Sequence, residues 1–426
     1  MMLKKLFQLE DHQTTVKKEW TAGLTSFFTI AYILIVNPAI LSDTGMPYEF
    51  ALLATALVTA FGCLLIGLWG NAPIILTPGM GVNAFFAYTL VIGMGWTWQQ
   101  GLAIVLLSGV LFLITALTPL AGKLAKAVPL SLKQGITVGI GVFLTFIGLQ
   151  KGGLVQGDAE TFVALGNLAE PAAMLTLFGL VIMLMLVVRK VKGAFLIGIA
   201  VISIAAGLFG ISSGSTGEAA ETTGAYASVF TSADFSAWAS IPFWTAVFSL
   251  TMIIVFESMG LLHGLLERKE KFGRSYQAAA ITAFGSGFLG TSPTIPAAES
   301  AAGVAEGGKT GLTAVVTGLL FLVALLFTPL LGFIPESAIA PVLIIVGGMM
   351  VQEIRHISFD DASEWFPAYL VIGIIPLTYS IADGIAFGFI AYPLLKMALG
   401  SPRAVSPVMY AISFLFFLHY VFTYMV

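Results

Sequence analysis

The sequence is poor in the residues that soluble, disulfide-bonded and metal-dependent proteins need. Of its 426 residues only 10% are charged, four are histidine and one, Cys63, is cysteine. A single cysteine excludes an intrachain disulfide and a cysteine-based zinc cluster. Soluble domains contain about 25% charged residues, so this composition excludes an ordinary globular domain of the cytoplasm.

The sequence also lacks the motifs of common hydrolases. It contains neither HExxH nor a glycine-rich phosphate loop ending in Lys-Ser or Lys-Thr, which removes the ligands of metalloprotease and ATPase chemistry. Ser258 has no histidine base at an obvious spacing, since His263 is the only nearby candidate. We therefore expect no enzyme activity, no cofactor and no metal site.

What the sequence has in abundance is hydrophobic residues, which make up 58% of the chain. A membrane-spanning helix needs about 20 predominantly apolar residues, and apolar runs of that kind follow one another almost from end to end. The sequence predicts an all-α polytopic membrane protein of about fourteen spans. The predicted spans are 22–41, 50–70, 73–94, 100–120, 131–150, 172–188, 193–210, 242–265, 274–289, 290–307, 311–332, 337–353, 363–379 and 383–398.

Basic residues predict the orientation of these spans, because loops on the cytoplasmic side carry an excess of Lys and Arg. The connection after the eighth span holds Arg268, Lys269, Lys271 and Arg274, and of the 19 basic residues only Lys151 falls on the outer side. The N-terminus is therefore expected in the cytoplasm of a multi-pass cell-membrane protein. The sequence leaves open whether a last apolar run, 405–425, crosses the membrane.

The two halves of the chain look like inverted repeats of seven spans each. Their third segments, 73–94 and 290–307, are interrupted by Gly and Pro, and Gly101-Leu102 and Gly311-Leu312 open the spans that follow. Broken segments at matching positions of inverted halves point to the substrate site of a transporter. The predicted organisation is a cytoplasmic segment 1–21, a first repeat 22–210, an extracellular loop 211–241, a second repeat 242–398 and a hydrophobic C-terminal segment 399–426.

Both broken segments place polar groups at membrane depth. In the first, Pro78 and Gly79 precede a half-helix expected from about Val82, with Asn83 in its first turn. In the second, Pro296 is expected at the first position of a half-helix and Glu299 in its first turn. Irregular backbone survives inside a membrane only where protein buries it or where it lines a cavity.

Two carboxylates lie well inside predicted spans. They are Glu257 in the eighth span and Glu299 in the second broken segment, and no Lys or Arg lies deep enough to neutralise either. An ionisable side chain at membrane depth is costly and is a functional hypothesis by default. Such acids bind cations, relay protons or pair with N–H groups of a substrate.

Four stretches of the sequence form long, specific motifs: GLTSFFTIAYILIVNPAIL (23–41), TPGMGVNA (77–84), ESAAGV (299–304) and YSIADGIAFG (379–388). In this order they resemble the AzgA-like purine permeases of the nucleobase–cation symporter superfamily. The resemblance implies fourteen spans in two inverted repeats, folded into a core and a gate domain with a purine held between them. Family members usually show Phe-Asp-Thr where this chain has Phe256-Glu257-Ser258, so the pose of the substrate is expected to differ.

The resemblance implies a transporter that imports adenine, guanine or hypoxanthine by proton symport with alternating access. By motif, Asn83 matches the asparagine of the third span, Glu257 the acid of the eighth and Glu299 the acid of the tenth. Glu299 and Glu257 are then the residues expected to carry the coupled proton. The residues expected to bind the purine are Asn83, Phe256, Glu257, Ser258, Thr294 and Glu299.

The alternative is an anion transporter of the same architecture, as in the sulfate permeases. Two half-helix N-termini would suit an anion, but two deep carboxylates and no deep base argue against it. The expected partners are thus a purine, a proton and the lipid bilayer, with no nucleic acid. Related folds often pair through the gate domain, which leaves a homodimer open.

Overall fold

The computed structural model describes residues 2–120, 122, 127–210, 230, 232–328 and 334–424. Within these ranges eight helices are long and apolar enough to cross a membrane by length and composition, and five shorter apolar helices accompany them. Every predicted span contains a helix. Most of the predicted loop 211–241 lies outside the described residues.

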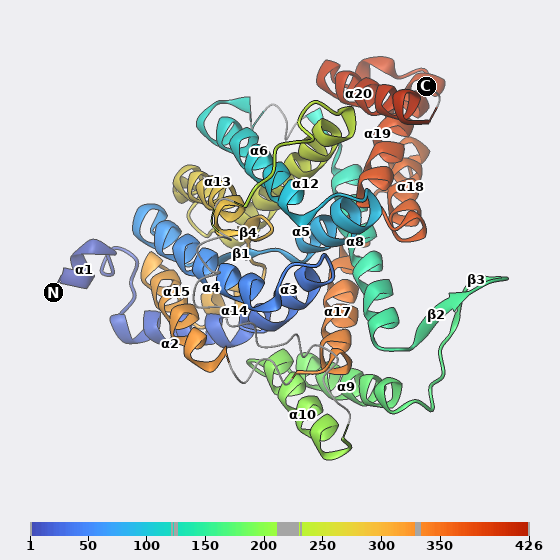
Figure 1. The fold of residues 1–426 in the computed structure, drawn as a ribbon. Helices are drawn as coiled ribbons and strands as arrows, with labels where there is room; N and C mark the ends of the chain where they lie inside the picture. The colour runs from blue at the N-terminus through green and yellow to red at the C-terminus, as the bar shows by residue number, and fades with distance from the viewer. Residues whose placement is uncertain are drawn as a thin grey trace.

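The helices pack into two bundles (Figure 1). We call the first the core bundle and the second the gate bundle, and each draws on both halves of the chain. The core bundle consists of α2 (Val16–Ile30), α3 (Ile33–Ser42), α4 (Tyr48–Leu65), α6 (Trp98–Leu117), α12 (Ile241–Leu265), α13 (Phe272–Leu289) and α15 (Gly311–Ala324). The gate bundle consists of α8 (Leu130–Lys151), α9 (Pro171–Val188), α10 (Ala194–Leu208), α17 (Glu336–Val351), α18 (Ala362–Thr378) and α19 (Ile381–Ala398).

The order of these helices confirms the repeat that the sequence predicts. In each half the first, second and fourth spans join the core bundle, the broken third segment runs through the centre of the molecule, and the last three spans join the gate bundle. Helices as apolar as α9 and α10 have no polar face to turn toward water, so their exposed hydrophobic side chains fit a lipid environment. The expected core and gate architecture is therefore present.

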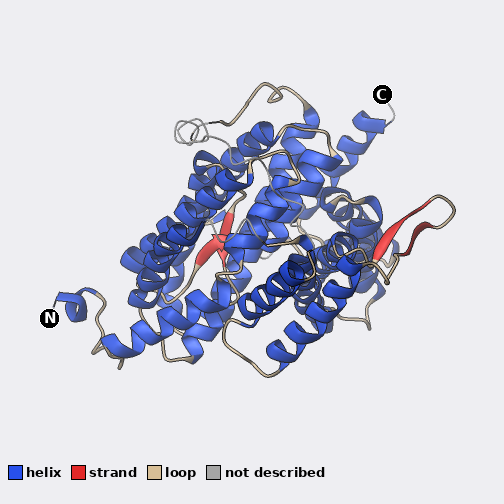
Figure 2. Ribbon diagram, turned by 60° about the horizontal axis from the view of Figure 1, so that its bottom comes forward, coloured by secondary structure: helices blue, strands red, loops and turns tan. Residues whose placement is uncertain are grey.

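The two broken segments meet at the centre of the molecule. Two short strands, β1 (Leu76–Pro78) and β4 (Thr294–Pro296), pair antiparallel with Leu76 opposite Pro296 and Pro78 opposite Thr294. Figure 2 shows them as the red crossing among the helices. After β1 the chain enters α5 (Met80–Ala84), which continues as a π-helix, η2 (Phe85–Gly93), and after β4 it enters α14 (Ser300–Ala305).

The half-helices begin at other residues than the sequence predicts. The first begins at Met80 rather than at Val82, because the extended backbone of Gly79 caps it and the Gly79 carbonyl already accepts from the Asn83 N–H at 2.8 Å. The second begins at Ser300, so the expectation that Pro296 opens it is wrong. Pro296 instead ends β4, where its missing N–H costs no hydrogen bond of the ladder.

The first helix of the core bundle also begins earlier than expected and buries a third acid. Helix α2 starts at Val16, capped by the Thr15 hydroxyl, and includes Glu19, which is fully buried. The Glu19 carboxylate accepts from the Lys309 and Thr310 N–H groups and from the Thr313 hydroxyl. Since these donors satisfy it, Glu19 has a structural role at the entry to α15.

Charged side chains join the two bundles at the ends of α3 and α8. The Lys151 ammonium, at the end of α8, lies 2.8 Å from Asp43 and 3.3 Å from Glu336 at the start of α17. The Tyr88 hydroxyl, from η2, donates to the second oxygen of Asp43 at 2.7 Å. We call Asp43, Tyr88, Lys151 and Glu336 the interbundle network.

The two ends of the chain pack against the bundles. At the N-terminus, Phe7 and Leu9 bury their side chains against Leu312 and Val316 of α15. At the other end α20 (Pro407–Tyr424) packs against α19 and α12, with the Ser413 hydroxyl donating to the Phe389 carbonyl at 2.5 Å. Two further strands, β2 (Val155–Asp158) and β3 (Phe162–Leu165), form a hairpin that projects from the gate bundle.

Candidate functional site

The site is built on main-chain bonds between the broken segments. Besides the strand pairing, the Ala297 N–H donates to the Ile75 carbonyl at 2.9 Å and the Ile75 N–H donates to the Ser300 hydroxyl at 3.0 Å. Unpaired backbone groups cannot be tolerated in a membrane interior. The two extended pieces therefore satisfy each other, and the half-helices that follow them are held at a fixed crossing.

Asn83 connects the first broken segment to the second. Its side-chain oxygen accepts from the Ser292 hydroxyl at 2.6 Å, and both residues are fully buried. The Asn83 amide nitrogen approaches the Met80 sulfur at 4.0 Å, which is a weak acceptor for a group with two donor hydrogens. Asn83 thus keeps hydrogen-bonding capacity for a further acceptor in the site.

Glu257 lies beside the first turn of the first half-helix. A Cβ atom at Gly81 would lie in van der Waals contact with a Glu257 carboxylate oxygen, at 3.8 Å, so the carboxylate lies directly beside this glycine. Within the described part of the chain no hydrogen bond or ion pair satisfies this carboxylate, although Glu257 is half-buried. A carboxylate left open in an apolar surrounding needs a donor from outside the protein.

The neighbours of Glu257 on α12 differ in what they contact. The Phe256 ring lies under the Lys133 ammonium of α8, 5.0 Å from the ring centroid, so Phe256 faces the gate bundle. Ser258 is fully buried, and its hydroxyl has no hydrogen-bond partner among the described residues. Phe256 is therefore placed where the two bundles meet, whereas Ser258 is turned into the packed protein.

Glu299 is paired with a tyrosine that the sequence did not single out. The Tyr32 hydroxyl donates to Glu299 at 2.5 Å across 267 residues. Tyr32 lies at the junction of α2 and α3, and its ring packs edge-on against Phe195 of α10, with centroids 4.9 Å apart. Tyr32 thus links the acid to the gate bundle.

Nothing in the sequence pattern could have found Tyr32, because its partner lies in the other half of the chain.

Thr294, which was expected to bind substrate, has a fully buried hydroxyl without a partner in the described structure, and its N–H donates to the Ser286 hydroxyl at 3.1 Å. The structure thus brings together Asn83 with Ser292 and Glu257 with Gly81. Glu299 meets Tyr32 rather than Glu257 or Asn83.

Comparison with known proteins places the chain in a family. The model of a family described as the Permease family matches residues 17–387. The chain belongs to this permease family. Its relatives include the nucleobase transporter PlAzg2 of Paenibacillus larvae, 44% identical over 89% of this chain and 77% of the relative.

Two further relatives match over nearly their whole length. The guanine/hypoxanthine permease PbuO of Bacillus subtilis is 39% identical over 97% of this chain and 99% of its own. The adenine permease AdeP of Escherichia coli is 35% identical over 99% and 96%. The resemblance to the AzgA-like purine permeases is thereby confirmed, and the chain is a membrane permease rather than an enzyme.

Solved structures share the fold at low sequence identity. The transmembrane domain of the cyanobacterial bicarbonate transporter BicA superposes with a TM-score of 0.66 at 17% identity, covering 86% of this chain and 96% of that one. SLC26A9 superposes with a TM-score of 0.65 at 12% identity, covering 89% and 66%. These neighbours confirm the inverted-repeat transporter fold.

Proposed function

We propose that this permease is a secondary active transporter that imports purine nucleobases across the cell membrane by proton symport. Adenine, guanine and hypoxanthine are the candidate substrates, because relatives that match over nearly the whole chain are named as permeases for these bases. The observation that carries the proposal is the open carboxylate of Glu257 beside Gly81. It is the group in the site best suited to receive the donors of a purine.

A purine offers N–H donors and ring-nitrogen acceptors in one plane. The Glu257 carboxylate can accept two adjacent N–H groups, and charge-assisted pairs of this kind are the strongest hydrogen bonds in proteins. The free Asn83 amide hydrogens can donate to a ring nitrogen. The Phe256 ring, at the contact between bundles, can cover a face of the base.

Glu299 is assigned the coupled proton. In its charged form it accepts from the Tyr32 hydroxyl, and in its protonated form it could donate in turn. Because Tyr32 also packs against Phe195 of the gate bundle, the protonation of Glu299 is linked to the contact between bundles. Such a link is what alternating access coupled to a proton requires.

Transport into proteoliposomes tests the proposal. Radiolabelled adenine, guanine and hypoxanthine are offered with an imposed inward proton gradient, and the gradient is then collapsed with an ionophore. We expect accumulation that requires the gradient and disappears in Glu257→Gln, while Glu160→Gln, an exposed acid of the β2–β3 hairpin, transports normally. Full uptake by Glu257→Gln would refute the assignment of the site.

The anion alternative is tested in the same assay. Competing sulfate or bicarbonate should leave purine uptake unchanged, whereas unlabelled purine should suppress it. The structural likeness to BicA and SLC26A9 is a likeness of fold alone and gives their cargo no support here.

A further inference from the structure

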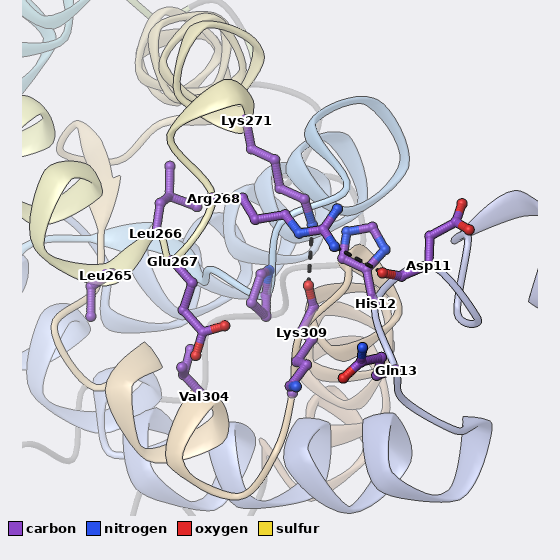
Figure 3. Close-up of a pocket in the computed structure, with 12 residues that line it drawn as sticks. Asp11, His12, Gln13, Leu265, Leu266, Glu267, Arg268, Lys271, Val304 and Lys309 are labelled. Atoms are coloured by element: carbon purple, nitrogen blue, oxygen red, sulfur yellow. Dashed lines mark hydrogen bonds between the residues drawn. The ribbon is translucent and has the colours of Figure 1, made fainter.

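A pocket lies away from the proposed purine site, at the end of the core bundle that carries the basic connection between α12 and α13. The pocket has a volume of about 200 Å³ and is lined by four parts of the chain: residues 11–13, Pro73, residues of the stretch 265–271, and the end of α14 with the residues after it (Figure 3). Neither Glu257 nor Glu299 lines it. It is therefore a separate site with its own chemistry.

Three cationic side chains line this pocket: Arg268, Lys271 and Lys309. Among the described residues, no ion pair neutralises the charge of Lys271. The Lys271 ammonium donates to two main-chain carbonyls, of Asn71 at 2.5 Å and of Lys309 at 3.1 Å, and the described residues give it no carboxylate partner. The Arg268 guanidinium donates to the main-chain carbonyl of Asp11 at 2.8 Å and lies 3.6 Å from Glu270. The carbonyls orient both head groups and leave the charge of Lys271 in place, while the Arg268 guanidinium shares its charge with the exposed Glu270 and keeps further N–H donors.

His12 adds a buried polar atom without a partner. Only 6% of the His12 side chain is exposed, and its Nδ1 bonds to the Gln8 carbonyl at 2.9 Å. Its Nε2 is buried and has no hydrogen-bond partner among the described residues. Figure 3 shows the imidazole beside the Arg268 guanidinium. A buried polar atom ordinarily has a hydrogen-bond partner. The free Nε2 of His12 therefore indicates that a ligand binds here.

Two carboxylates also line the pocket, and both are directed elsewhere. Figure 3 shows the Asp11 and Glu267 carboxylates pointing away from the head groups of Arg268 and Lys271. Burial, with help from Arg268, lowers the pKa of Lys271 to about 8, so the ammonium remains charged at neutral pH. The opposite wall of the pocket is apolar, formed by Leu265, Leu266 and Val304.

We propose that this pocket binds a phosphate group, held by Arg268, Lys271 and His12. Guanidinium and ammonium groups are the side chains that recognise phosphate oxygens. Because the Nδ1–H of His12 donates to the Gln8 carbonyl, the Nε2 of the neutral imidazole is an acceptor and can bond to a hydroxyl of the phosphate or of a lipid headgroup. The phosphate can belong to a soluble phosphate or to the headgroup of an anionic phospholipid, because basic pockets at membrane-protein ends bind such headgroups. The proposal does not depend on the identity of the transported molecule.

Two measurements on the purified full chain separate these sources. The first follows thermal unfolding in detergent while inorganic phosphate is titrated against chloride at equal ionic strength. The second uses native mass spectrometry after reconstitution with phosphatidylglycerol or phosphatidylcholine, to detect retained lipid. Both are made on the wild type, on Arg268→Gln and His12→Gln, and on Arg274→Gln, an exposed arginine after the same connection that does not line the pocket.

We expect saturable stabilisation by phosphate, selective retention of phosphatidylglycerol, or both. Arg268→Gln should weaken the effect about tenfold, as expected for the loss of one charge-assisted hydrogen bond, and Arg274→Gln should leave it unchanged. Phosphate stabilisation alone identifies a soluble ligand, and lipid retention alone identifies a headgroup. If phosphate acts no differently from chloride and lipid retention is the same in Arg268→Gln, the proposal is overturned.

Discussion

At the scale of single residues, the pair formed by Tyr32 and Glu299 is the contact whose removal is most informative. Replacing Tyr32 by Phe keeps the ring against Phe195 and removes only the hydrogen bond to Glu299. A hydrogen bond to a charged group contributes about 1.5–3 kcal/mol. We expect purine uptake by Tyr32→Phe to fall by about tenfold or more at unchanged abundance in the membrane.

The control for Tyr32→Phe is a double-mutant cycle with Glu299→Gln. If the tyrosine acts through the acid, the double variant transports as poorly as Glu299→Gln alone. Additive losses would show that Tyr32 acts by another route.

A second residue-scale prediction concerns Ser292. Replacing Ser292 by Ala leaves the buried oxygen of Asn83 without a donor, at a cost of about 1–3 kcal/mol. We expect a lower unfolding temperature and weaker purine binding by isothermal titration. Ser401→Ala, at an exposed position outside the site, should change neither quantity.

The sequence located only part of this site, for a physical reason. Asn83, Glu257 and Glu299 could be predicted because a polar side chain in an apolar span must have a partner or a function. Tyr32 could not be predicted, and neither could the pairing of Ser292 with Asn83, because these contacts join residues 267 and 209 positions apart and form only through the crossing of the halves. Pro296 was assigned to the wrong element because its fixed φ suits an extended strand as well as a helix start.

At the scale of elements, the pairing of β1 with β4 depends on a glycine. A Cβ atom at Gly79 would lie 2.3 Å from the Cδ1 of Ile295 in β4, closer than atoms can approach. We expect Gly79→Ala to destabilise the protein by about 1–3 kcal/mol through overpacking. Adding Ile295→Ala removes the obstructing atoms. The double variant should therefore have a higher unfolding temperature than Gly79→Ala alone.

If Gly79→Ala and Ile295→Ala are instead each destabilising and simply additive, the close approach of the strands is not what limits this position.

The N-terminal segment gives a prediction on pH. Burial, together with Lys271 and Arg268, lowers the pKa of His12 from its ordinary value of about 6.5, against the opposing effects of the hydrogen bond to the Gln8 carbonyl and of Asp11. His12 therefore takes up a proton more readily when the N-terminal segment is detached from the core bundle than when it is docked. Docking is strongest above about pH 6.5 and weakens as the pH falls below it.

Hydrogen exchange of residues 3–12 measures this docking. We expect exchange, corrected for its intrinsic pH dependence, to be severalfold faster at pH 5.5 than at pH 7.5. The variant His12→Asn, which does not titrate in this range, should lose the difference. An unchanged pH dependence in His12→Asn would show that another group controls the segment.

At the scale of the whole molecule, the arrangement of spans was the part most readable from sequence. Hydropathy and the positions of Gly and Pro predicted α8, for example, as 131–150, and the structure has it at Leu130–Lys151. Membrane helices are this predictable because each must satisfy its own backbone. The division into bundles follows from the repeat, whereas the ion pairs between bundles depend on which helix ends meet.

The interbundle network should restrain the relative motion of the bundles. Lys151 connects α8 of the gate bundle with Asp43 of the core bundle, at 15% and 24% side-chain exposure, where screening by water is incomplete. We expect Asp43→Asn and Lys151→Met each to change the rate of uptake by the same factor. The double variant should be no worse than either single one, because both remove one coupling.

Initial rates of uptake in proteoliposomes measure this coupling. Lys190→Met, an exposed lysine in the turn after α9, is the control and should transport at the wild-type rate. Independent, multiplicative effects of Asp43→Asn and Lys151→Met would show that the ion pair does not connect the bundles during transport.

The crossing of β1 with β4 has a consequence for how such a protein diversifies. Its bonds run between main-chain atoms, so they persist whichever side chains the two strands present. Mutation can then alter the chemistry offered to a cargo without dismantling the frame that holds it, provided that small residues such as Gly79 are kept. A scaffold of this kind can pass from one solute to another over evolutionary time, and the same fold does occur in proteins only 17% and 12% identical to this chain.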